Sequence, residues 1–476
     1  MVARPQLSII YSRAFLLIRH LSLPSASELV LANPSTMPRP RKNDSCNTCR
    51  RRKIKCSGES PICNQCTRAE RYCDWYRRSL DFRPWTGSTR PSLAGNREYE
   101  PPSDPRATLK KDQHLAKLFT HYIVTIADWY DLSDASRCFA VTVPLLALDE
   151  PLLFCATIAL SAMHRSKTSA AKLRDMAEYY HQCCIKLLIK LKDGDALMSN
   201  GVALAATCLL RSYEILDGGV DPNRHLRGAY SMASQHQGLL SGDGLLVAGS
   251  WNYLREDITY SLYEKCPLKI DLETVPLTTT HETDQHYLNS ASLVLGKLIN
   301  LAFDHALTYP EWEAALFTVR NWATSLPNRI MPFSVTDGKK TDTARPLPLV
   351  SFLQPCHTAS VHYFLVALFI LADHAPLDRL DELLALDPFD DKEPLPKEDL
   401  QERWALYISG SAFDAMHPLP TVLVNAFGPM AYCARKIRDK PAQQELVRQL
   451  IACKPSVGWP VDRLKDDLLA FWQSSG

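Results

Sequence analysis

Six of the fifteen cysteines fall in one short segment and follow an internal repeat. They are Cys46, Cys49, Cys56, Cys63, Cys66 and Cys73. Moving the first three along the chain by 17 residues places them on the last three, so the unit Cys-x2-Cys-x6-Cys occurs twice. Six residues that include Gly58 and Pro61 join the two units. The duplication predicts a small pseudo-twofold domain with the cysteine side chains at its centre.

The number of sulfurs indicates how metal would be bound. Structural zinc is tetrahedral, so two zinc ions need eight ligand positions, and six sulfurs suffice only if two of them bridge. A domain of about 40 residues lacks an adequate apolar core, so the metal must supply folding free energy. A disulfide framework and an accidental grouping are the alternatives, but no secretory signal favours them. We therefore predict two Zn²⁺ ions as the cofactor.

Charge separates this segment from the rest of the chain. Residues 38–78 hold 12 Lys/Arg and 4 Asp/Glu, whereas residues 79–476 hold 39 and 47. A basic segment on an acidic body suggests a polyanion as partner of the segment alone. The repeat is also asymmetric, because five of the six residues 50–55 are basic and Lys53 aligns with Glu70. We expect the first half to enter a DNA groove and the second half to contact the backbone.

At these residues the sequence resembles the fungal binuclear zinc cluster family of transcription factors, which shares the six cysteines, the basic first helix and a proline at the position of Pro61. The resemblance implies that Cys46 and Cys63 bridge the two zinc ions. Cys49 and Cys56 would complete one site, and Cys66 and Cys73 the other. It also implies a nuclear regulator of RNA polymerase II genes that reads CGG-type half-sites in double-stranded DNA and works with the transcription machinery.

The DNA-binding residues are carried over from the same resemblance. Lys53 is the best candidate for reading bases, with Arg52 beside it. The likelier phosphate contacts are Arg50, Arg51, Lys55 and Arg68. Residues 38–42 and 50–55 form two basic runs that suit nuclear import as well as DNA binding.

Residues 1–37 and 79–111 are expected to lie outside the folded domains. Three interpretations of the first segment are open: a mitochondrial presequence, a mis-assigned extension ahead of a true start at Met37, or a disordered segment. We favour the start at Met37. The second is expected to be a flexible linker, because five prolines between residues 84 and 105 break any helix and no heptad repeat persists. A homodimer through an adjacent coiled coil is therefore unsupported, which leaves a monomer or a dimer through the large domain.

Residues 112–476 are predicted to form a large all-α domain, because apolar residues recur at spacings of three and four. The helical stripes cover residues 115–129, 173–191, 202–216, 288–303, 312–322, 361–372, 464–472 and, more weakly, 423–437, which Gly428-Pro429 interrupts. The longest apolar run, Tyr363 to Ala372, is about half of what a membrane helix needs. We read it as a buried helix and expect no membrane partner.

This region more loosely resembles the fungal-specific transcription factor domain, through His225–Ala229, Trp251–Ile258 and Gly458–Pro460. The resemblance implies a regulatory domain that senses a small-molecule effector or a partner. Residues 378–402 mix ten acids with leucines, a composition typical of activation segments. A helix followed by a proline loop inside the domain is the interpretation we favour.

Other classes of protein find less support. The chain contains no G-x-G-x-x-G, H-E-x-x-H or G-x-S-x-G motif, and residues 338–341 lack the first glycine of a phosphate-binding loop. The nine scattered cysteines and the histidines suit a protein core, with one residue of the pair Cys183 and Cys184 facing inward. We therefore predict no enzyme. A metabolite-binding or enzymatic body anchored by the cluster stays open as an alternative, and metal storage is a poorer one.

Overall fold

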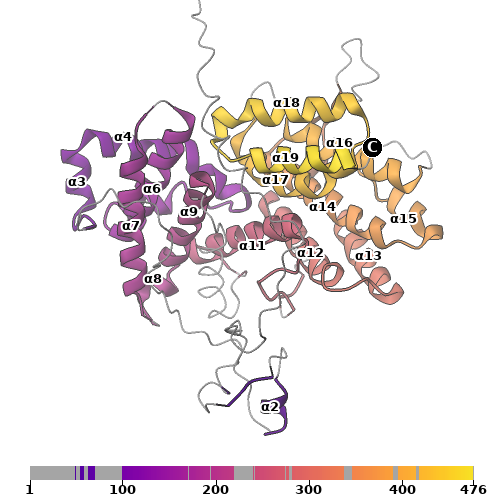
Figure 1. Ribbon diagram of the computed structural model, residues 1–476, viewed down its shortest axis with the longest axis horizontal. Coiled ribbons are helices and arrows are strands. Elements are labelled where there is room, and N and C mark those ends of the chain that lie inside the picture. The colour runs from indigo at the N-terminus through magenta and orange to yellow at the C-terminus, as the bar shows by residue number, and fades with distance from the viewer. Residues whose placement is uncertain are drawn as a thin grey trace, which may run out of the picture. The chain divides into compact units, whose positions relative to one another are not determined.

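The computed structural model describes the residues 49, 54–57, 63–69, 99–169, 171–192, 194–218, 240, 242–273, 275–277, 281–336, 346–389, 395–413 and 418–474. The chain divides into two compact units, Met1–Ser79 and Leu80–Gly476. The first contains the short helix α2 (Asn64–Thr67), and the second contains the helical body (Figure 1). A zinc cluster segment and a large all-α domain, the predicted fold class, are both present. His225–Ala229 and residues 338–341 lie outside the described residues.

The helical body begins before residue 112. Tyr99 packs against Tyr179, and the Tyr99 carbonyl accepts a hydrogen bond from Lys186. Helix α3 (Pro105–Lys111) follows, with the Asp104 side chain accepting from the Ala107 amide. The expectation that Pro105 breaks a helix was wrong, because proline fits the first turn, where its missing N–H has no helical partner.

The next segment changes its helical geometry twice. Helix α4 (Gln113–His121) runs into a π-helical turn, η1 (Tyr122–Ile126), and then into two 3₁₀ turns, η2 (Ala127–Trp129) and η3 (Asp131–Ser133). The predicted stripe over residues 115–129 is therefore helical but not regular. π-Turns inside helices often mark functional sites.

The first group of packed helices surrounds α6 (Pro151–Thr168), which contacts α7 (Arg174–Lys190), α9 (Val202–Asp217) and α5 (Thr142–Ala147). Helix α8 (Ala196–Ser199) precedes α9. Both Cys183 and Cys184 are fully buried, so the expectation that only one of them faces inward was wrong. Adjacent helical residues are about 100° apart, and a face buried against a neighbour is wide enough to hold both.

The second group is built on α11 (Leu245–Glu264), α12 (Asp284–Ala302) and α14 (Pro355–His374). Helix α14 is long and apolar enough to cross a membrane by length and composition, yet 94% of that stretch is buried inside the structure. The buried helix predicted from residues 363–372 is confirmed, and it is twice as long as the apolar run. A helix passing through a protein core needs no polar face.

Helices α16 (Lys397–Ala412) and α17 (Pro420–Cys433) pack against α14. The expected interruption at Gly428-Pro429 does not occur, since α17 continues through Pro429. Gly428 lies against Thr259 of α11, where an added Cβ would come within 3.0 Å of the Thr259 hydroxyl. The glycine therefore serves a close approach of two helices.

The remaining elements complete the body. They are α13 (Tyr309–Thr324), η4 (Asn328–Ile330), the antiparallel pair β1 (Ser334–Thr336) and β2 (Leu349–Ser351), η6 (Leu377–Arg379), α15 (Leu380–Leu384), η7 (Ala434–Lys436), α18 (Lys440–Val457) and α19 (Asp462–Ser474). In the acidic stretch, Leu383, Phe389 and Leu400 are buried. The described part of that stretch therefore belongs to the folded domain, as we favoured.

Candidate metal centre and nucleic-acid interface

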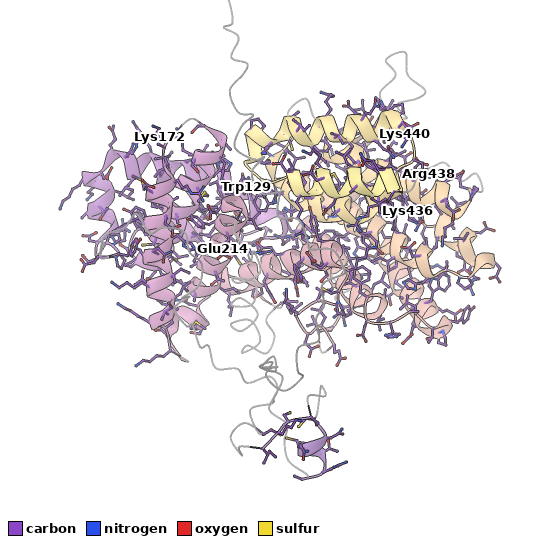
Figure 2. All side chains as sticks on the ribbon, viewed as in Figure 1. Trp129, Lys172, Glu214, Lys436, Arg438 and Lys440 are labelled. Atoms are coloured by element: carbon purple, nitrogen blue, oxygen red, sulfur yellow. The ribbon has the colours of Figure 1, made fainter. Side chains whose placement is uncertain are left out.

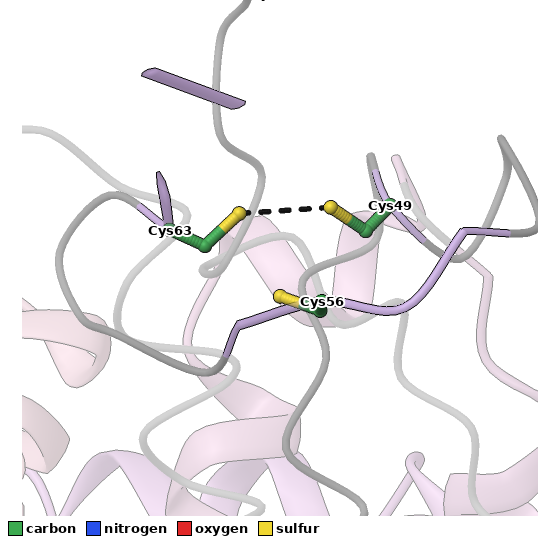
Figure 3. A group of neighbouring side chains, drawn as sticks. All are labelled: Cys49, Cys56 and Cys63. Carbon is green, nitrogen blue, oxygen red and sulfur yellow. Dashed lines mark hydrogen bonds between the residues drawn. The ribbon is translucent and has the colours of Figure 1, made fainter. Parts of the chain in front are cut away.

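Three of the predicted zinc ligands meet in the first unit. The sulfurs of Cys49, Cys56 and Cys63 all lie within 4.8 Å of one another (Figure 3). The Cys49 and Cys63 sulfurs are 3.6 Å apart, and the Cys49 and Cys66 sulfurs are 4.0 Å apart. Residues from both halves of the repeat therefore share one sulfur cluster. Cys46 and Cys73 lie outside the described residues.

These separations match a metal centre. With zinc–sulfur bonds of about 2.3 Å, the edge of a tetrahedral site is about 3.8 Å. A disulfide would bring two sulfurs to about 2.05 Å. The 3.6 and 4.0 Å separations lie on either side of the tetrahedral edge. The cluster thus fits zinc and does not fit a disulfide framework.

Short-range backbone bonds hold the cysteines in place. Cys63 is the N-cap of α2, and its carbonyl accepts hydrogen bonds from the amides of Cys66 and Thr67. This turn directs the two sulfurs of the Cys-x2-Cys pair to the same side. The amide of Asn64 donates to the Ser57 hydroxyl at 2.9 Å, which ties the end of the first half to the start of the second. The sequence analysis had not singled out Ser57 and Asn64.

The environment of Cys63 favours a thiolate. Burial raises the pKa of this thiol, but hydrogen bonds from the Cys66 amide and from three neighbouring thiols outweigh it and lower the pKa to about 6. Zinc binds the thiolate form of cysteine, so a thiol that loses its proton easily suits a ligand. Cys63 and Cys49 each contact sulfurs of both halves.

The described basic residues of the unit are open to solvent. Lys55 and Arg68 are both exposed, as contacts to a DNA phosphate must be. Ile54, beside Lys55 in the first half, is 38% exposed. The other predicted DNA-binding residues, Arg50, Arg51, Arg52 and Lys53, lie outside the described residues.

A sulfur cluster that fits zinc, together with a large helical domain, can be compared with known protein families. Residues 44–82 match the fungal Zn(2)-Cys(6) binuclear cluster domain, and residues 117–263 match the fungal specific transcription factor domain. These two segments are similar to the two domains of the fungal binuclear zinc cluster transcription factors, and the matches cover part of the chain.

Two relatives share this similarity. The chain is 30% identical over 126 residues to the Zn(2)-C6 fungal-type transcription factor afumD of Aspergillus fumigatus, covering 26% of this chain and 32% of that protein. It is 36% identical over 72 residues to the transcriptional regulatory protein moc3 of Schizosaccharomyces pombe, covering 14% of each. The chain therefore aligns with a third or less of either relative. No solved structure matches the chain.

Proposed function

We propose that this protein is a zinc-dependent, sequence-specific DNA-binding regulator of RNA polymerase II genes that acts in the nucleus. The observation that carries the proposal is the sulfur cluster, whose spacing suits tetrahedral zinc and whose members come from both halves of the repeat. The match to the zinc cluster family adds the expectation of DNA binding.

The proposed ligand set places two zinc ions among six cysteines. One ion takes Cys49 and Cys56, and the other takes Cys66 and Cys73, with Cys46 and Cys63 bridging. The contacts of Cys63 with thiols of both halves support its role as a bridge. Six thiolates and two zinc ions together carry a charge of −2, which reduces the balance of residues 38–78 only to about +6 and leaves ample charge for counterion release on DNA.

The proposed DNA contacts divide into base-reading and phosphate-binding groups. Lys53, with Arg52 beside it, reads the guanines of a CGG-type half-site, because a Lys or Arg side chain pairs with O6 and N7 of guanine. Arg50, Arg51, Lys55 and Arg68 bind phosphates, and the exposure of Lys55 and Arg68 supports this role. We further propose that residues 38–78 form the cluster domain and that the helical domain of residues 112–476, with the segment from Tyr99 to Lys111 packed on it, works with the transcription machinery and an effector.

The experiment compares Lys53→Ala with Arg68→Ala in the zinc-loaded full chain. Each variant is titrated against a CGG duplex and against a scrambled duplex of the same length. Lys53→Ala should weaken CGG binding by about 1–3 kcal/mol and leave the scrambled duplex almost unaffected. Arg68→Ala should weaken both duplexes alike and reduce the salt slope by about one.

Zinc content measured on the same samples serves as the control, because both variants should keep two ions per chain. An equal loss on both duplexes for Lys53→Ala would make Lys53 a phosphate contact. Equal affinity of the unaltered chain for both duplexes would refute the specific reader.

A further inference from the structure

The helical unit contains a cavity of about 490 Å³ that is open to solvent on one side. Its wall comes from η2, α9, α11, α17 and the segment 459–464. Trp129 of η2 and Glu214 of α9 both line it, and Figure 2 shows where each lies. Six aromatic side chains line the same cavity: Trp129, Tyr130, Tyr260, Tyr263, Phe427 and Trp459. The aromatic part of the wall suits a flat, apolar small molecule.

Arg211 of α9 supplies a buried cation in this wall. Only 7% of the residue is exposed, and its Nε lies 3.3 Å from a carboxylate oxygen of Glu256. That approach lacks hydrogen-bond geometry, and among the described residues neither Nε nor Nη1 of Arg211 has a hydrogen-bond partner. Burying a donor without an acceptor costs about 1–3 kcal/mol, and more for a charged group. Beside its ion pair with Glu256, the guanidinium therefore keeps a donor, Nη1, without an acceptor among the described residues, and the cavity has room for one.

A second hydrogen-bond donor in the wall, also among the described residues, is buried without an acceptor. The indole Nε1 of Trp129 is buried, with the residue 4% exposed, and has no hydrogen-bond partner in the part of the chain that the structure describes. The Trp129 ring stands edge-on to Trp459, with ring centres 6.1 Å apart. Two buried donors on one cavity wall indicate a ligand that offers acceptors.

Among the described residues of the wall, Glu256 is the acid that forms an ion pair with Arg211. Arg255 is 3% exposed, and its hydrogen-bond acceptors among the described residues are neutral; they include Asn252 Oδ1 at 2.6 Å and Ser133. Its positive charge therefore adds to that of Arg211 in a region of low dielectric constant. Arg463 pairs with Glu264 at 2.7 Å, and both are more than a third exposed.

Glu256 adds less negative charge than a free carboxylate would. Burial raises its pKa to about 7, although the neighbouring Arg211 and Arg255 act in the opposite direction. The Glu256 side chain is 25% exposed, and a partly protonated carboxyl repels an incoming monoanion less than an ionised one. Among the acids that line the cavity, Glu214 is buried.

We propose that this cavity binds a small organic monocarboxylate with a flat apolar body, whose carboxylate accepts hydrogen bonds from Arg211 and whose body lies against the aromatic wall. The proposal identifies the chemical class of the effector, and in this it rests on the proposed function. A single negative charge with two acceptor oxygens satisfies the guanidinium, because an Arg–carboxylate pair is charge-assisted and often bidentate.

The probes that test this are 2-naphthoate and its neutral amide, 2-naphthamide, which share one shape and differ in charge. Each is titrated into the zinc-loaded full chain while tryptophan fluorescence is recorded, since Trp129 and Trp459 line the cavity. Thermal unfolding is followed in parallel, because a ligand that binds the folded state raises the melting temperature. 2-Naphthoate should bind saturably and more tightly than the amide.

Arg211→Gln should weaken 2-naphthoate binding roughly 10- to 100-fold and leave the amide unchanged, as loss of a charge-assisted hydrogen bond predicts. Arg106→Gln is the matched control, because that arginine is exposed and pairs with Asp149 away from the cavity wall. It should bind like the unaltered chain. Arg211→Lys keeps the charge and should recover part of the affinity, which separates recognition from loss of folding.

Two results would overturn the proposal: no saturable binding of 2-naphthoate at millimolar concentration, or equal binding of acid and amide with Arg211→Gln unaffected. DNA titrations on the same samples distinguish this failure from failure of the proposed function. Lost ligand binding with CGG binding intact refutes only the cavity proposal. Lost CGG binding with ligand binding intact refutes only the DNA reader.

Discussion

Gly201 offers a direct test of how α9 and α11 are held together. It precedes α9 with a φ of +86°, and an added Cβ would lie 2.3 Å from the backbone nitrogen of Leu246, in the first turn of α11. Gly194 has nearly the same φ, +88°, but none of the described atoms lies within 4 Å of its Cβ position. The two glycines therefore share the conformational cost of an alanine and differ in the space available.

The expected magnitudes follow from that difference. An L-residue in the left-handed region costs about 1–2 kcal/mol, offset in part by the lower entropy of the unfolded chain. Gly194→Ala should therefore destabilise the fold by about 1 kcal/mol. Gly201→Ala adds the displacement of a helix backbone, which by analogy with overpacking costs about 1–3 kcal/mol more. The total should be about 2–4 kcal/mol.

The assay is urea unfolding followed by ellipticity at 222 nm, with both variants analysed at a common denaturant slope. Because α9 carries Arg211 and α11 carries Arg255, Gly201→Ala should also weaken binding of 2-naphthoate, whereas Gly194→Ala should not. If Gly201→Ala costs no more than Gly194→Ala, the close approach of these helices is wrong.

Three further results are expected. Zinc chelation should abolish DNA binding and leave the urea midpoint of the helical domain unchanged, because the chain divides into two compact units. A change in the urea midpoint of the helical domain on chelation would contradict this. Arg403→Met should lower the unfolding free energy by about 3–5 kcal/mol, because it leaves the buried carboxylate of Asp387 without its ion-pair partner. Adding Asp387→Asn should restore part of this loss. No recovery in the double variant would contradict the importance of the pair. Glu256, with its folded-state pKa raised to about 7, should lower stability as pH rises from about 4.5 to 7. Glu256→Gln should remove this component, seen as a flatter dependence of unfolding free energy on pH, and an unchanged dependence would refute the shifted pKa.

The helical body was largely predictable because its signal is local. Apolar residues at spacings of three and four correctly indicated α7, α9, α12, α13, α14 and α19. The errors arose where tertiary contacts or position within a helix change the meaning of a residue. Pro105 starts a helix that the Asp104 side chain caps, and Gly428 allows α11 to approach α17. Neither meaning is visible from composition alone.

The two sites differ in the same way. The sulfur cluster was predictable because zinc ligands come from one short segment with fixed spacing, and the structure brings Cys49, Cys56 and Cys63 together. The cavity was not, because Trp129 and Arg211 come from distant segments. Arginine and tryptophan have no characteristic spacing, and their missing hydrogen-bond partners appear only in the folded chain.

The most direct test of the central claim is a competition titration of the zinc-loaded full chain with CGG and scrambled duplexes over a range of salt concentrations. Two zinc ions per chain should accompany a preference for CGG of at least tenfold, about 1.4 kcal/mol. Affinity should fall steeply with salt on both duplexes. Removal of zinc should abolish the preference, and its return should restore it. Equal affinity for the two duplexes, or an undiminished preference without zinc, would contradict the account.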